Sequence, residues 1–133
     1  MQDNAPRQFN PVVWFEIYVQ DMERARAFYE AVLAIKLETL GDPTNMGMNM
    51  LVFPGMGAER PGAGGALVQM QGVASGPGGT LVYFGCDDCA VEESRVQAAG
   101  GAVVKPKTSI GEYGFMVLAQ DTEGNLIGLH SMK

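Results

Sequence analysis

Trp14, Glu16 and Tyr18 occupy alternate positions of the apolar stretch Val12–Val19, and their types could support chemistry. Alternate residues of a β-strand point to the same face of its sheet, so an extended conformation places the carboxyl group between two aromatic side chains. A carboxyl group on an apolar wall loses hydration, which raises its pKa and suits it to act as a general base. The alternative is an ordinary glutamate near a strand end, paired or hydrated. Glu16 is the candidate catalytic residue.

Three further side chains carry reactive groups. His130 is the single histidine, and it either lines a cavity or lies on a surface or dimer interface. Cys86 and Cys89 form a C-x-x-C pair, but a zinc site needs further ligands that the sequence lacks. Redox chemistry favours a positively charged setting, whereas Asp87 and Asp88 make this one negative. The pattern favours a structural role for the cysteines and leaves their function open.

Methionines are frequent, and Met46, Met48 and Met50 share one face of an expected strand. Flexible thioether side chains adapt to varied apolar partners, so this face suits the wall of a ligand pocket, although ordinary core filling is favoured. The stretch Gly55–Gly65 has no phosphate-binding glycine motif. It is expected to be a loop and a candidate lid.

The elements that position these residues occur twice. Shifting the sequence by 67 positions brings Trp14 onto Leu81 and Asp21 onto Asp88, and both copies continue with a helix and further apolar strands. Asp21 is expected to cap the first helix and either Asp87 or Asp88 the second, which should extend to about Ala99. The expected strands are 12–19, 35–40, 46–53 and 66–70 in the first copy, and 80–86, 102–104, 114–120 and 125–130 in the second.

Length and charge limit the class of protein. The 133 residues suit a single domain, with module one at about 11–70 and module two at about 80–131. A net charge of −6 and a pI near 4.6 argue against nucleic acid and anionic membranes as partners. No apolar run is long enough to span a membrane, and no secretory signal pattern is present. A cytoplasmic location is expected.

Two motifs support a family resemblance. The first is V-x-D-x-x-x-A-x-x-F-Y-E at Val19–Glu30, and the second is D-T-E-G-N-x-I-G-L at Asp121–Leu129. Together with the duplicated pattern, they resemble the vicinal oxygen chelate superfamily of glyoxalases, bleomycin-resistance proteins and extradiol dioxygenases. The chain looks most like the glyoxalase-related branch of uncertain activity. The resemblance implies an α+β fold in which two βαβββ modules form a curled mixed sheet around a cavity, and it implies a homodimer.

The same resemblance implies metal ligands at matched positions of the first and fourth strands of each module. Counting from the motifs places these positions at Trp14, Val68, Leu81 and Gly128. None of these side chains can donate a lone pair to a divalent metal. We therefore expect no metal and no other cofactor.

The expected function follows from the side chains that should face the cavity. These are Trp14, Glu16, Tyr18, Met48, Met50, Val68, Leu81, Tyr83, Gly128 and His130. Their apolar and aromatic character, with few polar groups, suits a small, mainly apolar or aromatic molecule. The chain is predicted to be a metal-free binding protein of the glyoxalase or bleomycin-resistance type. The alternatives are a glyoxalase-related lyase or isomerase that uses a metal or Glu16, and a domain that only contacts a partner.

Overall fold

The structure is a computed structural model that describes residues 10–42, 47–55 and 62–133. The chain divides into two compact units, and each is described by itself. One unit comprises Trp14–Leu81. The other comprises Val82–Lys133 together with the N-terminal residues up to Val13. The first two residues of the N-terminal strand, Val12 and Val13, are thus grouped with the second half of the sequence.

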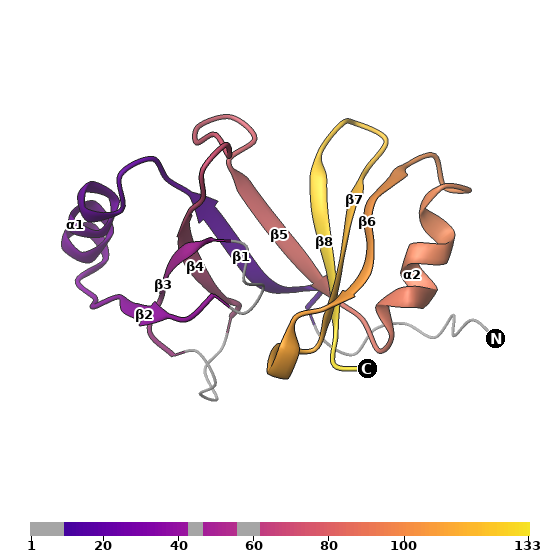
Figure 1. Ribbon diagram of the computed structural model, residues 1–133, viewed down its shortest axis with the longest axis horizontal. Coiled ribbons are helices and arrows are strands. Elements are labelled where there is room, and N and C mark those ends of the chain that lie inside the picture. The colour runs from indigo at the N-terminus through magenta and orange to yellow at the C-terminus, as the bar shows by residue number, and fades with distance from the viewer. Residues whose placement is uncertain (1–9, 43–46, 56–61) are drawn as a thin grey trace. The chain divides into compact units, whose positions relative to one another are not determined.

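Module one is a strand, a helix and three further strands. Its elements are β1 (Val12–Tyr18), α1 (Met22–Leu33), β2 (Glu38–Leu40), β3 (Asn49–Val52) and β4 (Gly64–Gln69) (Figure 1). The strands lie in the order β2-β3-β4-β1. The pair β1–β4 is parallel and the other two pairs are antiparallel, so the sheet is mixed.

Module two repeats this order. Its elements are β5 (Thr80–Gly85), α2 (Cys89–Val96), β6 (Ala102–Ser109), the short 3-10 helix η1 (Gly111–Tyr113), β7 (Phe115–Gln120) and β8 (Leu126–Ser131). The strands lie in the order β5-β8-β7-β6, with β5 and β8 parallel. The repetition confirms the predicted α+β fold of two βαβββ modules.

Two residues of the first motif, Asp21 and Glu30, fix the start of helix α1 and the connection that follows it. Asp21 is the N-cap, and its Oδ1 accepts a hydrogen bond from the backbone N–H of Arg24 at 3.1 Å. Beyond the helix, Glu30 Oε2 accepts from the backbone N–H of Leu37 at 2.9 Å and from Arg26 Nε at 3.2 Å. Glu30 therefore fixes the connection from α1 to β2. The C-cap residue, Ala34, has left-handed backbone torsions.

Helix α2 is shorter than predicted. Its N-cap is Asp88, whose side chain accepts from the backbone N–H of Ala90, as expected from the repeat. The helix ends at Val96 instead of continuing to Ala99. The backbone N–H of Gly101 turns back to the carbonyl of Val96 at 3.0 Å, which closes the helix early.

Strand β6 is longer than predicted. The expected strand ended at Val104 and a connection began at Pro106, but β6 continues through Pro106 to Ser109. Proline has no N–H to donate to a sheet, so it occurs on edge strands or at bulges. β6 is the last strand in the order, and its register with β7 shifts on both sides of Lys105. The edge position and the shifts accommodate the proline.

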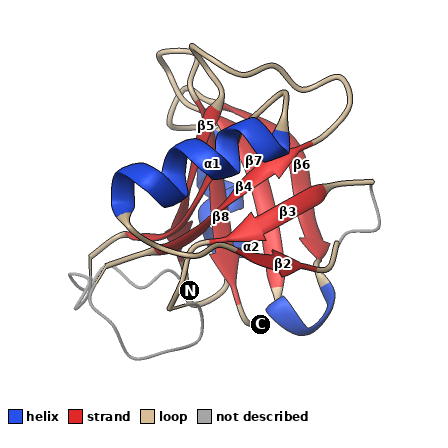
Figure 2. Cartoon of the chain, turned by 90° about the vertical axis from the view of Figure 1, so that its left-hand side faces the viewer, coloured by secondary structure: helices blue, strands red, loops and turns tan. Residues whose placement is uncertain are grey.

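The two faces of the module-one sheet separate the side chains as the alternation predicts. The face that packs against α1 holds a core of Val19, Met22, Leu37, Leu51 and Leu67, and Figure 2 shows the helix lying across this face. The opposite face holds a second cluster of Met50, Val52, Ala66 and Val68, with Trp14 and Tyr18 packed against it. Residues of β1 thus alternate between two clusters, which confirms the predicted register of this strand.

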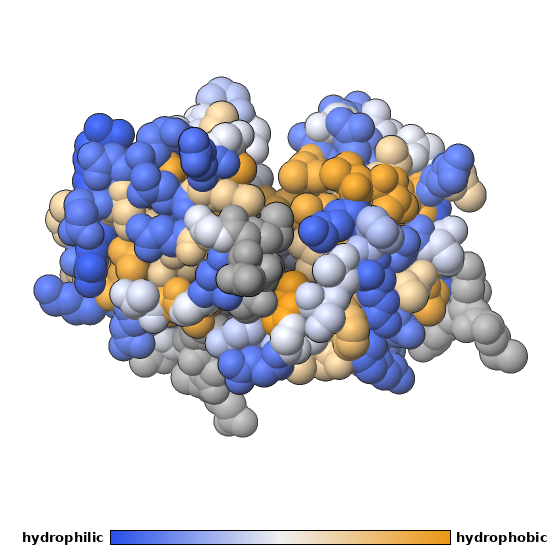
Figure 3. Space-filling model, in the orientation of Figure 1, coloured by the Kyte–Doolittle hydropathy of each residue, from blue (hydrophilic) through white to orange (hydrophobic). Residues whose placement is uncertain are grey.

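Module two buries Cys89, Val117 and Leu129, with Phe84, Cys86 and Phe115 packed against them. Figure 3 shows an apolar area over the strands of this module, whose exposed large apolar side chains include Val103, Val104 and Leu126. Neither α1 nor α2 combines the length and apolar composition needed to cross a bilayer, and the search covered the described residues only.

Candidate functional site

Three rows of side chains cross the face of module one that is turned away from α1. In the first row Trp14 pairs with Gly64, in the second Glu16 pairs with Ala66, and in the third Tyr18 pairs with Val68. Val52 and Met50 extend the second and third rows on β3. We call this side the Glu16 face, and it consists of Trp14, Glu16, Tyr18, Met48, Met50, Val52, Ala66 and Val68.

Glu16 is the polar centre of this face. The Tyr18 hydroxyl donates a hydrogen bond to Glu16 Oε1 at 2.8 Å, and Trp14 Nε1–H donates to Oε2 at 3.2 Å. Each carboxylate oxygen therefore receives one neutral donor from the neighbouring position on its own face of the strand. Glu16 is 6% exposed, whereas Trp14 and Tyr18 are half-buried. The sequence predicted that the three share a face but not these hydrogen bonds.

Burial raises the pKa of Glu16, and the hydrogen bonds from Tyr18 and Trp14 oppose this shift without cancelling it. The cause agrees with the surroundings, because the cluster beneath the carboxyl group consists of apolar side chains. The second row places Ala66 beside Glu16 and Val52 beyond it. A raised pKa is one property that general-base chemistry uses in a carboxyl group.

Gly64 and Asp42 shape the margins of the Glu16 face. A Cβ atom on Gly64 would contact the Trp14 ring at 3.4 Å, so the indole lies over a residue with no side chain. Asp42 Oδ2 accepts from the backbone N–H groups of Gly47 and Met48 at 2.7 and 3.0 Å. This contact holds Met48 beside the cluster, and Met50 is buried within it. Met46 and the candidate lid residues 56–61 lie outside the described residues.

Tyr83 and Gly128 are neighbours on β5 and β8 of module two. The ring of Tyr83 covers the Cα atom of Gly128 so closely that an added Cβ would overlap three ring carbons. Both residues are buried, and Leu81 is also buried. The Tyr83 ring therefore occupies the space that a side chain at position 128 would need. The sequence placed these residues on one face but did not predict this close packing.

His130 follows Gly128 on the same face of β8. Its Nε2 lies 2.6 Å from the carbonyl oxygen of Tyr113 in η1. A carbonyl oxygen only accepts, so Nε2 carries the hydrogen and Nδ1 is the acceptor in the neutral imidazole. The contact ties β8 to η1, an element that the sequence pattern did not reveal. His130 is half-buried.

The residues at the implied metal positions do not fit a metal ion. Trp14, Val68, Leu81 and Gly128 offer no side-chain lone pair for coordination. The match of Val68 with Gly128 is wrong, because Glu16 pairs with Ala66 as Tyr83 pairs with Gly128. Ala66 is the true counterpart of Gly128, and it is equally unable to coordinate. Among the described residues, no three His, Cys, Asp or Glu side chains form a group that could hold a metal.

Cys89 is the first residue of α2, and Cys86 directly follows β5. Cys89 is fully buried in the core of module two, and its backbone N–H donates to the Ser131 hydroxyl at 3.0 Å. Cys86 is half-buried and packs against the same core. Their packing agrees with the structural role that the sequence favoured.

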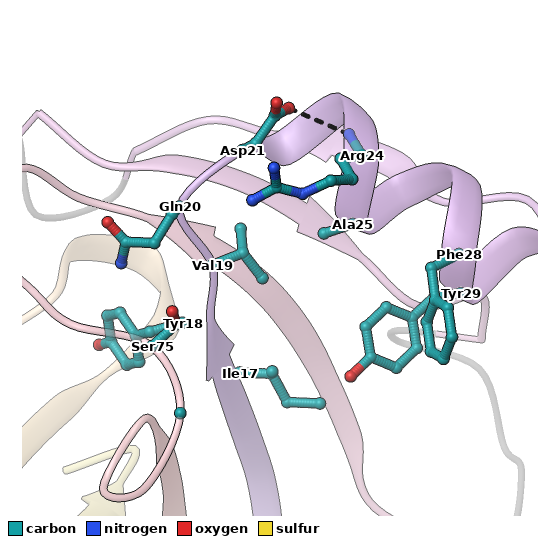
Figure 4. Close-up of a pocket in the computed structure, with 11 residues that line it drawn as sticks. Ile17, Tyr18, Val19, Gln20, Asp21, Arg24, Ala25, Phe28, Tyr29 and Ser75 are labelled. Atoms are coloured by element: carbon teal, nitrogen blue, oxygen red, sulfur yellow. Dashed lines mark hydrogen bonds between the residues drawn. The ribbon is translucent and has the colours of Figure 1, made fainter.

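An open groove on the α1 side of module one was not predicted. It has a volume of about 410 Å³ and is lined by Ile17, Tyr18, Val19, Gln20, Asp21, Arg24, Ala25, Phe28, Tyr29, Ser75 and Gly76. Figure 4 shows Phe28 and Tyr29 extending from the helix toward the strand. Phe28 is 58% exposed, so the groove includes a large apolar side chain that is open to solvent. Its polar side chains belong to exposed or half-buried residues, and Asp21 already caps α1, so the groove lacks a buried carboxyl group like that of Glu16.

Comparison with known proteins agrees with this fold. Residues 12–52 match the family described as bleomycin resistance protein-like N-terminal. The chain is 29% identical over 119 residues to CFP32 of Mycobacterium tuberculosis and to its Mycobacterium bovis counterpart, both named as candidate glyoxylases. The match covers 89% of the chain but 42% of these relatives, so the chain spans less than half of their length.

Solved structures share the fold at low identity. Methylmalonyl-CoA epimerase from Mycobacterium tuberculosis has a TM-score of 0.67 at 15% identity, covering 92% of this chain and 88% of its own. Hypothetical protein BH1468 from Bacillus halodurans C-125 has a TM-score of 0.68 at 14% identity, covering 92% and 94%. These structures show the fold, and together with the sequence motifs and the match over residues 12–52 they support the resemblance to the vicinal oxygen chelate superfamily.

Proposed function

We propose that the chain is a metal-free binding protein for a small, mainly apolar or aromatic molecule, of the bleomycin-resistance type within its superfamily. The observation that carries the proposal is the Trp14–Glu16–Tyr18 group on an apolar floor. Binding sites for small molecules combine largely apolar walls with a few placed polar groups. The indole ring adds a flat surface for stacking, and the residues at the implied metal positions cannot coordinate a metal.

The test is a binding screen with planar aromatic compounds. Trp14 is the only tryptophan, so its emission reports directly on the Glu16 face. Compounds that change this emission saturably are then measured by calorimetry against three variants. Trp14→Ala should weaken binding about tenfold or more, as loss of a buried aromatic contact does. Trp14→Phe should retain most of the affinity, because it keeps an aromatic ring.

Phe28→Ala is the matched control, since it removes an aromatic ring from the groove on the opposite side of the sheet. It should leave the affinity unchanged. If Phe28→Ala weakens binding and Trp14→Ala does not, the groove is the binding site and the proposal is wrong. Elemental analysis of protein purified without chelator should find well under one divalent metal ion per chain.

A glyoxalase-related lyase or isomerase is the second candidate function. The buried carboxyl group of Glu16, whose pKa is raised, favours it because such a group can remove a proton from carbon. Incubating the protein with α-hydroxy carbonyl compounds in D2O and following deuterium incorporation by NMR tests this function. Incorporation that Glu16→Gln abolishes would support enzymatic turnover. Binding without incorporation would support the first candidate.

The assembly and location belong to the same proposal. We propose a homodimer in the cytoplasm, as the superfamily resemblance and the sequence pattern indicate. Sedimentation equilibrium should give about twice the 14.2 kDa mass of one chain. A monomer at high micromolar concentration would exclude the dimer. The predicted ligand contacts of module two, Leu81, Tyr83, Gly128 and His130, stay predictions for the same binding measurements.

A further inference from the structure

We propose that the ligand of the Glu16 face carries a cationic N–H group on a planar apolar body, such as an aromatic amidinium or protonated amine. The inference rests on the proposed binding function and adds the charge of the ligand. The neutral hydrogen-bond partners of the Glu16 carboxylate and the apolar side chains around it point to such a ligand.

Among the described residues, the Glu16 carboxylate receives hydrogen bonds from neutral groups only. In the part of the chain that the structure describes, the hydrogen-bond partners of Glu16 are the Tyr18 hydroxyl and the Trp14 indole. Neither of the two salt bridges of the described residues includes Glu16. A buried carboxylate without a cation is costly, so such a group is either driven toward its protonated form or stabilised by a positive charge or a metal beside it. The side chains at the implied metal positions cannot coordinate a metal, which leaves a positive charge as the partner that would stabilise the charged form of Glu16.

The two hydrogen bonds prepare the carboxyl group as an acceptor. The indole N–H can only donate, so Trp14 fixes Glu16 Oε2 as an acceptor. The Tyr18 hydroxyl donates to the other oxygen. A carboxylate can accept about four hydrogen bonds, so about two acceptor positions remain. A planar N–H cation is the chemistry that fills such positions with charge-assisted hydrogen bonds.

The surroundings also suit the rest of such a molecule. Trp14 supplies an indole ring, and the face of such a ring attracts cations as well as planar apolar groups. The neighbouring side chains of Met50, Val52 and Val68 are apolar, which matches an apolar body. The net charge of −6 favours the approach of a cation over that of an anion.

Benzamidinium and benzamide form the test pair, because they have nearly the same shape and differ in charge. Binding of both is measured by calorimetry to the wild-type chain, to Glu16→Gln and to Glu23→Gln. Glu23 lies exposed on α1, which covers the opposite side of the sheet, and its variant has the same change in net charge. The wild-type chain and Glu23→Gln should bind benzamidinium about tenfold or more tightly than benzamide. Glu16→Gln should lose this preference and keep its affinity for benzamide.

The outcomes separate the two proposals. If benzamide binds as tightly as benzamidinium, the charge inference is wrong and the binding function stands. If the preference for benzamidinium survives in Glu16→Gln, the cation binds elsewhere and the inference is wrong. If neither compound binds and no planar compound changes Trp14 emission, both the inference and the proposed function fail. Circular dichroism of each variant establishes that it is folded.

Discussion

The ring of Tyr83 lies against the Cα atom of Gly128 on the adjacent strand, so glycine is required there by packing. Gly128→Ala should lower the free energy of unfolding by about 1–3 kcal/mol, the usual range for an overpacked core. Urea denaturation measures the change. Gly64→Ala is the control, because its added Cβ makes an ordinary 3.4 Å contact with the Trp14 ring. Combining Gly128→Ala with Tyr83→Ala should give less than the sum of the separate losses.

Glu16 should make stability fall as pH rises. Its pKa is raised in the folded state by burial, so the folded chain binds the proton more tightly than the unfolded chain. Stability from this group is therefore greatest below 4.5, its ordinary value, and decreases as pH rises through the interval up to the folded pKa. The apolar neighbours of the second row, Ala66 and Val52, do not titrate. The difference in unfolding free energy between Glu16→Gln and the wild-type chain should grow in favour of the variant across this interval. A difference independent of pH would contradict the prediction.

Trp14 emission should titrate with Glu16. The indole N–H donates directly to the carboxylate, so protonation changes the partner of the only tryptophan. The expected midpoint lies above 4.5, the ordinary value for a glutamate. Fluorescence measured between pH 4 and 9 provides the curve. Glu16→Gln should abolish it, while Tyr18→Phe removes an opposing hydrogen bond and should move the midpoint upward.

Ala34→Gly should stabilise the chain. Ala34 ends α1 with a φ of 55°, a left-handed conformation that costs an L-residue about 1 kcal/mol and glycine very little. Thermal unfolding should show a gain of about 0.5–1 kcal/mol, reduced by the greater freedom of glycine in the unfolded chain. Ala27→Gly in the middle of the same helix is the control and should destabilise by about 1 kcal/mol. Equal effects of the two changes would contradict the assigned helix end.

Ser131 should contribute to the start of α2. Its buried hydroxyl accepts from the Cys89 backbone N–H at 3.0 Å and donates to the Lys133 carbonyl at 2.8 Å. Ser131→Ala leaves a buried N–H without this partner and should cost about 1–2 kcal/mol in urea denaturation. Ser94→Ala is the control, because the exposed Ser94 hydroxyl bonds only within its own helix. Its effect should stay within about 0.5 kcal/mol.

The sequence predicted those features that depend on short-range geometry. The period of a strand places Trp14, Glu16 and Tyr18 on one face without any knowledge of their neighbours. Residue type predicts the cap at Asp21 and restricts the second cap to Asp87 or Asp88. The repeat and the motifs predicted the α+β fold of two βαβββ modules. These predictions needed no pairing between distant strands.

Features that depend on long-range pairing were missed. Counting from Gly64 matched Val68 with Gly128, although the register of β4 against β1 makes Ala66 the counterpart. Register is set by contacts between strands, and a shift of two residues preserves the face while changing every partner. Strand β6 beyond Pro106 was missed for the same reason, since its partner β7 supplies the pairing. The groove beside Phe28 had no signal in the pattern, because helical spacing does not reveal which apolar residues stay exposed.

The N-terminal residues up to Val13 belong to the same compact unit as Val82–Lys133, and this affects folding during synthesis. The backbone N–H of Gly85 donates to the carbonyl of Pro11 at 2.9 Å, and Val13 is the last N-terminal residue of that unit. The ribosome makes Pro11 more than 70 residues before Gly85. At 5–20 residues per second, this leaves roughly 4–15 s in which Pro11 has no partner. The earliest part of the described chain to leave the ribosome is therefore among the last to dock, and completion of the second unit has to wait for it.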